Sequence, residues 1–283
     1  LQRSASHVGY AWSLSIRWPT SVARIPEVLG VLPERRRIRI RSNPVTSLRV
    51  ASRIGRIIAV TTAPVIFTIF NRPDTTRQVF ETIRAAKPQK LLVVADGPRV
   101  DRPGEAEKCI ATREIIDEVD WDCEVEKNFS ETNLGCRVRC ASGITWAFTL
   151  VDKAIILEDD TLPSTSFFPY CTELLDRYEG DERVTMISGN NFLFGNAATT
   201  DSYYFSRYPH VWGWATWRRA WAKYDLDMTR WPEMRRRKLF DQYLPTGSER
   251  YFWDSILQYV YEGNIDTWDY QFVYSMWANS GLS

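Results

Sequence analysis

An alternation of short apolar runs with amphipathic segments is the feature that most constrains the fold of this chain. The first run, residues 65–70 in "APVIFTIFNRPD", ends in polar residues and leads into a segment of helical period at residues 74–86, which Asp74 is positioned to cap. The scheme repeats with apolar runs at residues 91–94 and 154–157, with a further strand at about residues 123–126, and with helical segments at residues 105–118, 137–150 and 165–178. Strands separated by helices of this length predict an α/β fold with a mostly parallel central sheet flanked by helices on both faces.

Three adjacent carboxylates end the fourth predicted strand, in "KAIILEDDTLPS". Glu158, Asp159 and Asp160 directly follow a strand that is predicted to be buried. Like charges crowded at the end of a strand repel one another, so we expect a positive charge that the sequence itself does not supply. A solvated surface turn is the alternative interpretation.

Two further polar clusters are expected beside the acidic triplet. In parallel sheets, ligands bind outside the carboxyl ends of the strands, at the point where the strand order reverses. Asn71 and Arg72 end the first run and Asp96 ends the second, so both clusters should converge with the triplet on one site. A helix cap at residues 71–74 and an ordinary Asp-Gly turn at residues 96–97 remain as alternatives.

The missing positive charge is predicted to be a metal ion. Carboxylate oxygens suit Mg²⁺ or Mn²⁺, and such ions usually take one or two protein carboxylates and complete their shell with water and substrate phosphates. A diphosphate is therefore the natural companion. The two His and five Cys are too scattered for a nitrogen or sulfur site, and the Cys are predicted to be reduced thiols. The sequence contains neither the P-loop motif G-x-x-x-x-G-K-[ST] nor the Rossmann motif G-x-G-x-x-G, so neither of these phosphate-binding devices is supported.

Charge is distributed unevenly along the chain. Residues 1–60 contain 11 Arg, no Lys and two acidic residues, a net charge of +9, whereas the remaining residues sum to −8. Such a segment is compatible with a transit peptide, with an arm that binds nucleic acid or a membrane surface, or with a poorly ordered extension. We favour the extension, because "ERRRIRIR" has no interleaved aromatic residues and no glycines to cradle phosphate.

Several motifs, taken in order, resemble bacterial nucleotide-diphospho-sugar glycosyltransferases of the GT-A fold. The motifs are "VIFTIFNRPD", "VVADGPR", "ETNLGCRVRCASGITWAF", "IILEDDTLPS", "WGWATW" and "IDTWDYQ". More distantly, they resemble the inverting N-acetylglucosaminyltransferase of N-glycan synthesis, whose metal motif is also E-D-D. The resemblance covers about residues 63–283. It implies a nucleotide-sugar half at about 61–190, an acceptor half at about 191–283 with an irregular Trp-rich part, and a further C-terminal element.

The resemblance also implies roles for individual residues. Asp160 would ligate the metal, with Glu158 and Asp159 near the ribose and the donor sugar. Phe70, Asn71, Arg72 and Asp96 would hold the base and the ribose. Arg137 or Arg139 would approach the diphosphate near a helix start, where backbone N–H groups also favour anions. A solvated helix face is the alternative for both Arg residues, and the sequence does not choose between them.

The second half of the chain is rich in Trp. Eight of the twelve Trp fall between residues 212 and 277, and core packing is the expected role of most of them. The segment "WGWATW" is the exception. Three Trp around a Gly suggest a loop at a cleft, so Trp212, Gly213 and Trp214 are predicted to contact a sugar.

Inverting transfer requires a general base that takes the proton of the acceptor hydroxyl. Asp269 in "TWDYQ" and Asp254 in "FWDS" are the candidates. Asp269 is preferred, because by resemblance its W-D pair matches the base-bearing pair of the distant relative. Asp254 lies in a segment of helical period and is expected to pair with a nearby Arg.

The sequence therefore predicts a metal-dependent, inverting glycosyltransferase that uses a nucleotide-diphosphate sugar and a carbohydrate or glycolipid acceptor. No nucleic-acid partner is expected, and the predicted location is cytoplasmic, with peripheral membrane association allowed. A sugar-nucleotide nucleotidyltransferase is one alternative, although its usual Gly-rich strand-to-helix loop is not visible. A non-catalytic carbohydrate-binding protein is the other alternative, and the acidic triplet counts against it.

Overall fold

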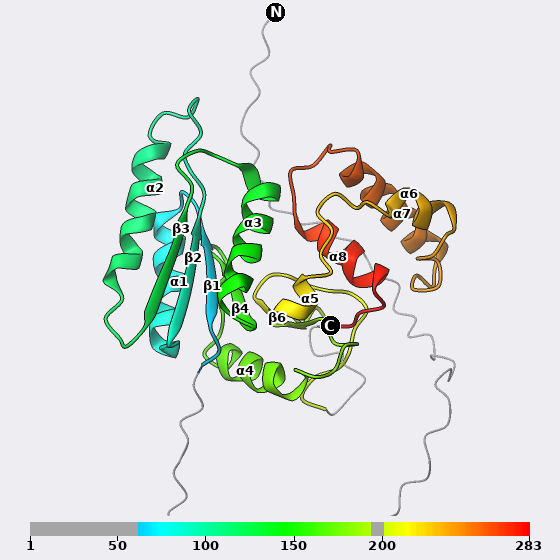
Figure 1. Ribbon diagram of the computed structural model, residues 1–283, viewed down its shortest axis with the longest axis horizontal. Coiled ribbons are helices and arrows are strands. Elements are labelled where there is room, and N and C mark those ends of the chain that lie inside the picture. The colour runs from blue at the N-terminus through cyan, green and yellow to red at the C-terminus, as the bar shows by residue number, and fades with distance from the viewer. Residues whose placement is uncertain (1–61, 194–200) are drawn as a thin grey trace, which may run out of the picture. The chain divides into compact units, whose positions relative to one another are not determined.

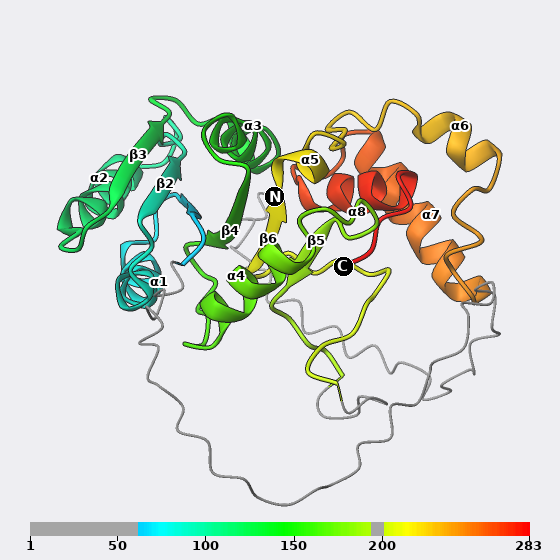
Figure 2. The same cartoon turned by 60° about the horizontal axis from the view of Figure 1, so that its bottom comes forward.

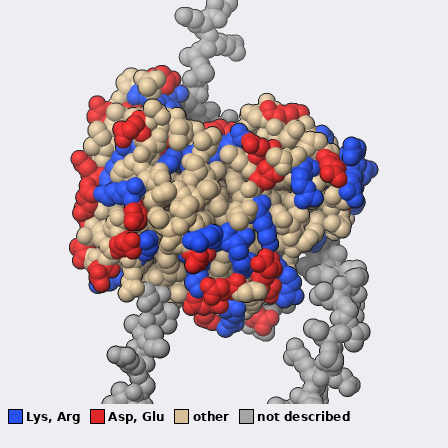
Figure 3. Space-filling model, in the orientation of Figure 1, with Lys and Arg blue, Asp and Glu red and all other residues tan. Residues whose placement is uncertain are grey.

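The computed structural model describes residues 62–193 and 201–283 (Figure 1). The predicted Arg-rich extension at residues 1–60 lies outside this described part. None of the helices in the described part is long and apolar enough to cross a membrane. Charged side chains of both signs are interspersed over the face shown in Figure 3.

A six-stranded mixed sheet forms the centre of the molecule, in the order β3-β2-β1-β4-β6-β5. The first four of these strands are parallel, β6 is antiparallel to β4, and β5 is antiparallel to β6. This arrangement confirms the predicted α/β class and the mostly parallel sheet. The strands are β1 (Val65–Ile69), β2 (Lys90–Ala95), β3 (Glu124–Phe129), β4 (Lys153–Glu158), β5 (Met186–Ser188) and β6 (Trp214–Trp217).

Helices cover both faces of the sheet, as Figures 1 and 2 show. Helix α3 and the C-terminal helices pack on one face, and α1, the 3-10 helix η1 and α4 pack on the other. Helix α2 packs against α1 and η1. The helices are α1 (Pro73–Ala86), α2 (Glu105–Glu114), η1 (Ile115–Glu118), α3 (Gly135–Leu150), α4 (Phe167–Arg177), α5 (Arg218–Trp221), α6 (Trp231–Arg236), α7 (Gly247–Tyr261) and α8 (Asp269–Ala278).

Alternating side chains of each central strand supply two separate apolar cores. In β1, Ile66 joins the core beneath α3, whereas Val65 and Phe67 join the core beneath α1 and α4. Both sets are fully buried because a parallel strand with helices on both faces has no solvated side. Because these strands are buried on both faces, they are nearly continuous apolar runs, and this pattern could be recognised in the sequence.

The Trp-rich part differs from the expected loop. Residues Trp214–Trp217 of "WGWATW" form strand β6, which pairs with β4 and is buried throughout. Of the eight Trp between residues 212 and 277, six are buried, which confirms the core role expected for most of them. Helices α5, α6, α7 and α8 occupy much of this part and pack their aromatic side chains around Trp214 and Trp221.

Candidate active site

The strand order reverses between β1 and β4. The chain runs outward from β1 to β2 and β3, and then returns to place β4 on the other side of β1. The backbone N–H of Phe70, just after β1, donates to Oδ2 of Asp159, just after β4, at 3.1 Å. The predicted convergence of the first polar cluster with the acidic triplet is therefore present at the switch point, where open α/β sheets bind ligands.

Arg72 supplies the positive charge that the acidic triplet needs. Its Nη2 lies 2.5 Å from Oδ1 of Asp159, and its Nη1 lies 2.7 Å from Oδ2 of Asp160. Burial alone would lower the pKa of Arg72, but the two carboxylates raise it. The expectation that the sequence supplies no such charge is wrong, because the pairing of β1 with β4 brings together groups that lie 87 and 88 residues apart.

Burial still disfavours the charged form of Asp159. Its side chain is almost fully enclosed, and this raises the pKa of Asp159 although Arg72 and the N–H of Phe70 act in the opposite direction. Arg72 itself holds the N-cap position of α1, and Asp74 lies in the first turn of that helix without capping it. The Asp cap considered for residues 71–74 is thus not formed.

Glu158 is the carboxylate that remains without a cationic partner. Its side chain makes no hydrogen bond within the described part of the chain. Burial, followed by the charges of Asp160, Asp159 and Asp269, raises the pKa of Glu158 to about 7. A half-buried acid with a raised pKa beside a switch point is the kind of perturbed group found at functional sites.

A cavity of about 440 Å³ opens beside Asp160. The Asp160 side chain is 47% exposed, and Trp212 across the cavity is 62% exposed. Asn190, which was not predicted, also lines the cavity, and its Oδ1 is buried without a hydrogen-bond partner among the residues that the structure describes. The cavity therefore combines a free carboxylate edge, an unpaired amide oxygen and an exposed indole ring.

Two glycines build the wall of this cavity. The N–H of Gly189 donates to the carbonyl of Gly213 at 2.9 Å, and a Cβ on Gly189 would lie 2.8 Å from that carbonyl oxygen. Gly213 has φ of +75°, and a Cβ there would approach Cγ2 of Thr161 to 3.2 Å. Gly213 thus lines the cavity through a close backbone approach, and its predicted contact with a sugar stays a prediction.

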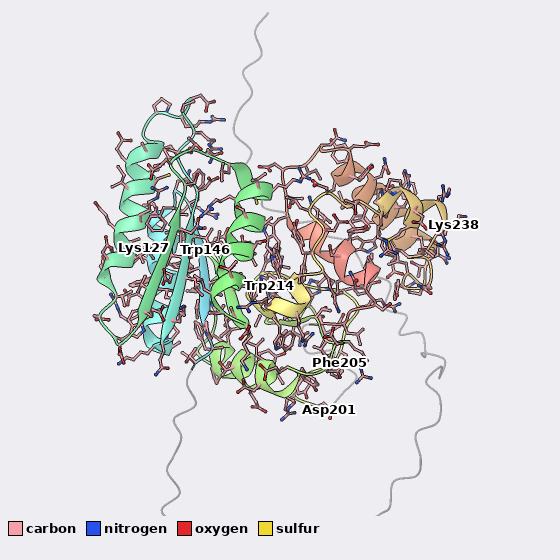
Figure 4. All side chains as sticks on the ribbon, viewed as in Figure 1. Lys127, Trp146, Asp201, Phe205, Trp214 and Lys238 are labelled. Atoms are coloured by element: carbon pink, nitrogen blue, oxygen red, sulfur yellow. The ribbon has the colours of Figure 1, made fainter. Side chains whose placement is uncertain are left out.

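The prediction that Trp214 contacts a sugar is wrong, because its side chain lies in the core. Trp214, labelled in Figure 4, is fully buried in strand β6, where its ring stacks on Trp268 at a centroid distance of 5.7 Å and packs on Phe272. Trp212 precedes the strand, and Gly213, with φ of +75°, turns the backbone between the two residues, so Trp212 is exposed while Trp214 enters the core. The predicted sugar contact remains a proposal for Trp212 and Gly213, which line the cavity.

Asp96 is occupied by the start of α3. Its two carboxylate oxygens accept the N–H groups of Leu134 and Gly135 at 2.9 and 3.1 Å and the side-chain amide of Asn133 at 3.0 Å. Oδ1 also accepts the N–H of Gly97. Asp96 lies at the predicted edge of the sheet, and its hydrogen bonds hold the N-terminus of α3 beside the site.

A second carboxylate, Asp266, was not predicted and completes this arrangement. It accepts the N–H groups of Cys136 at 2.9 Å and Arg137 at 3.0 Å. Gly135, with φ of +78°, allows the approach, because a Cβ there would lie 2.7 Å from Oδ2 of Asp266. The helix N-terminus expected to receive a diphosphate is therefore filled by the protein's own carboxylates.

The structure separates the two Arg residues between which the sequence could not choose. Arg139 is buried and donates to the carbonyls of Ala95 and Asn128, so it is committed to the sheet and does not face a diphosphate. Arg137 is partly exposed and pairs with Asp227 at 2.8 Å. Arg137 is the one that could turn toward an anion.

The two base candidates lie in different surroundings. Asp254, on α7, forms a two-pronged ion pair with Arg235 at 2.8 Å, which confirms the pairing expected for it. Asp269 begins α8, and its charge contributes to the raised pKa of Glu158. Oδ1 of Asp269 accepts from the Thr267 hydroxyl and from the N–H of Tyr270, and Oδ2 accepts no hydrogen bond from the described residues.

Asn71 is held by a buried acid that was not predicted. Its side-chain amide donates to Oε1 of Glu105 at 2.9 Å, and Glu105 also binds the backbone and guanidinium of Arg99. The guanidinium of Arg99 lies 5.6 Å from the ring centre of Phe70. Hydrogen bonds from Arg99 lower the pKa of Glu105 to about 2. In the sequence, the only signal that Glu105 could hold Asn71 was its position at the start of a predicted helix.

The lowered pKa of Glu105 makes a stability prediction. A carboxyl with a folded pKa of about 2 and an ordinary value of 4.5 stabilises the fold fully above pH 4.5 and loses this effect as the pH falls toward 2. We expect Glu105→Gln to lower the melting temperature by about 5 °C at pH 7 and by much less at pH 3. Thermal unfolding followed by circular dichroism at both pH values checks this, and an equal loss at both would contradict it.

The residues present can accommodate a divalent cation, although the structure does not itself define a metal centre. Among the described residues, no three His, Cys, Asp or Glu side chains are grouped to hold a metal ion. Arg72 binds one oxygen of Asp160 and leaves the other free, and Glu158 forms no ion pair with any described residue, although the charge of Arg72 acts on it from a distance. Two carboxylates of this kind fit an ion that takes its remaining ligands from water and phosphate.

Comparisons with known proteins add little to this geometry. No protein-family model matches the chain, and no curated protein matches its sequence. Among solved structures, the chain is similar to 4-diphosphocytidyl-2C-methyl-D-erythritol synthase from Anaerococcus prevotii, with 12% sequence identity, a TM-score of 0.34, and coverage of 69% of this chain and 99% of that one. A likeness at this level carries no functional argument, so the proposal below rests on the site.

Proposed function

We propose that this protein transfers a sugar from a nucleotide-diphosphate sugar to a hydroxyl acceptor with inversion at the anomeric carbon. The observation that carries the proposal is the acidic triplet at the switch point between β1 and β4. There, Asp160 faces a cavity shared with the exposed ring of Trp212, and Glu158 lies unneutralised within the electrostatic reach of Asp269.

The donor would lie across the carboxyl ends of β1 and β4. Phe70 and Asn71, fixed by Arg99 and Glu105, would border the base and ribose. Asp160 and Glu158 would hold Mn²⁺ or Mg²⁺, which supplies positive charge to a diphosphate when bound. Arg72 is the chain's own cation at this place, and its guanidinium could pass from Asp160 to a phosphate oxygen.

The acceptor proton would pass to Asp269. As the acceptor oxygen forms its bond to the anomeric carbon, the bond from that carbon to the diphosphate oxygen breaks with its electron pair, and the proton moves to Oδ2 of Asp269. Thr267 and the N–H of Tyr270 hold the other oxygen and so fix the orientation of the carboxylate. Attack from the face opposite the leaving group gives inversion.

Trp212 would support a sugar ring at the mouth of the cavity. Its indole is exposed, lines the cavity and packs edge-on beside Phe192, with ring centres 6.2 Å apart. We expect Trp212→Ala to weaken the affinity for the sugar substrate about tenfold and Trp212→Phe to weaken it much less. Titration calorimetry with the donor sugar checks this order, and equal losses in the two variants would contradict stacking.

The described geometry disfavours both alternatives. The connection from β1 to α1 consists of Phe70, Asn71 and Arg72, without the glycines that would wrap a triphosphate. A carbohydrate-binding protein built on the Trp cluster is disfavoured because most of that cluster is buried in the core.

The products of the reaction separate these functions. The protein is incubated with Mn²⁺ and a panel of nucleotide-diphosphate sugars, and separately with nucleoside triphosphates and sugar phosphates. Release of nucleoside diphosphate in the first set supports the proposal, and release of pyrophosphate in the second supports the nucleotidyltransferase. Binding of sugar alone, unaffected by EDTA and without turnover, would identify a carbohydrate-binding protein.

A further inference from the structure

A second and larger groove lies between α6 and α7. Its volume is about 760 Å³, and it shares no lining residue with the cavity beside Asp160. The floor is apolar and consists of Trp231, Met234, Phe240 and Leu244, each of which is almost fully buried. Nothing in the proposed transfer uses this groove.

The rim of the groove carries more cations than anions. Arg235 and Arg250 face Asp254 and Asp241, at 2.8 and 3.8 Å. Two further rim cations, Arg236 and Lys238, are exposed and have no acidic partner among residues 62–193 and 201–283. Figure 3 shows Lys and Arg gathered at this edge of the molecule, where Figure 4 labels Lys238.

Exposed aromatic rings stand beside these cations. Tyr251, on the rim, is 78% exposed, and its neighbour Phe252 is 47% exposed. Tyr261 lies on the same rim and is 42% exposed. Solitary exposed apolar residues need no explanation, but several together with unpaired cations mark an interaction surface. Cationic and aromatic side chains around an apolar floor are the combination found where proteins meet the headgroup layer of a bilayer.

We propose that the α6–α7 groove docks the protein on an anionic phospholipid bilayer. Arg236 and Lys238 contact headgroup phosphates, Tyr251 and Tyr261 lie at the headgroup level, and the apolar floor receives the upper part of an acyl chain. The lining has four cations and two acids, so its charge complements a negative surface.

Other occupants fit less well. The lining comes from α6, α7 and the turns at residues 237–246 that join them, and it includes no strand edge with which an acidic peptide could pair. A second copy placed symmetrically on the groove would bring Arg236 and Lys238 close to the same residues of its partner, and like charges repel.

Vesicle flotation tests the proposal with the full chain and without any sugar donor, so the result is independent of the proposed transfer. The vesicles contain phosphatidylcholine alone or with about 30% phosphatidylglycerol. We expect binding only to the anionic vesicles, lost at about 0.5 M salt. Arg236→Glu with Lys238→Glu should weaken this binding at least about tenfold.

Matched variants make the test specific. Arg102→Glu with Lys108→Glu changes the charge equally at exposed positions near α2 and should bind as the wild type does. Tyr251→Ser should weaken binding without any change of charge. Hydrogen exchange on vesicles should show protection at residues 231–261.

Several results would overturn the proposal. These are equal binding to neutral vesicles, equal loss in the two charge variants, protection confined to residues 1–61, or protection of residues 231–261 by self-association or by an acidic peptide in the absence of vesicles. Melting temperatures of all variants exclude misfolding as the cause of a loss.

Discussion

We expect Asp269→Asn to lower the rate of sugar transfer by roughly 10² to 10⁴ while the affinity for the donor stays unchanged. Asparagine keeps the shape of the side chain and can still accept from Thr267 and from the N–H of Tyr270, so α8 should begin as before. Only the ability to take a proton is lost. Single-turnover transfer with a saturating donor, together with calorimetry of donor binding, measures the two quantities separately.

Asp254→Asn is the matched control for this experiment. Asp254 is also a carboxylate on a C-terminal helix, but it pairs with Arg235 on the rim of the other groove. Its substitution should affect stability slightly and transfer hardly at all. If Asp254→Asn abolished transfer with intact donor binding while Asp269→Asn turned over normally, the assignment of the base would be reversed.

The second large effect is expected at the metal site. Asp160→Ala should abolish the Mn²⁺-dependent part of nucleoside diphosphate binding, a loss of about 100-fold or more, because an ion of this type depends on one or two carboxylates. Calorimetric titration in Mn²⁺ and in EDTA measures that part. The exposed carboxylate Asp176, which pairs with Lys153, provides the control variant Asp176→Ala. Unchanged Mn²⁺-dependent affinity in Asp160→Ala would refute the assignment.

The parallel strands could be predicted because burial on both faces requires a nearly continuous run of apolar residues, which is visible in the local sequence. The runs that became β1, β2 and β4 are continuous apolar stretches bounded by polar residues, and each appeared in the sequence within one or two residues of its observed bounds. Strand β6 left no such trace. Its four residues include two Trp, and they form a strand only because β4 and β5 lie on either side.

The candidate site was predictable at the level of positions but not of charges. Topology alone placed Asn71, Arg72, Asp96 and the acidic triplet at one edge of the sheet. Pairing depends on distances that no sequence pattern encodes, so the counter-charge from Arg72 and the filling of the α3 N-terminus by Asp266 could not be foreseen. For the same reason, the buried state of Arg139 and Trp214 was missed.

Two carboxylates, Asp96 and Asp266, bind the start of α3, and this restricts how the two sides of the site can move apart. Asp96 follows β2 in the proposed nucleotide-sugar half, Asp266 precedes α8 in the proposed acceptor half, and the two accept successive N–H groups at the start of α3. A hinge that separated the halves at this edge would have to break charge-assisted hydrogen bonds on at least one side. In the proposed transfer, the separation of Asp160 from Asp269 would then be fixed before the substrates bind, and the substrates would enter through movements of side chains and loops.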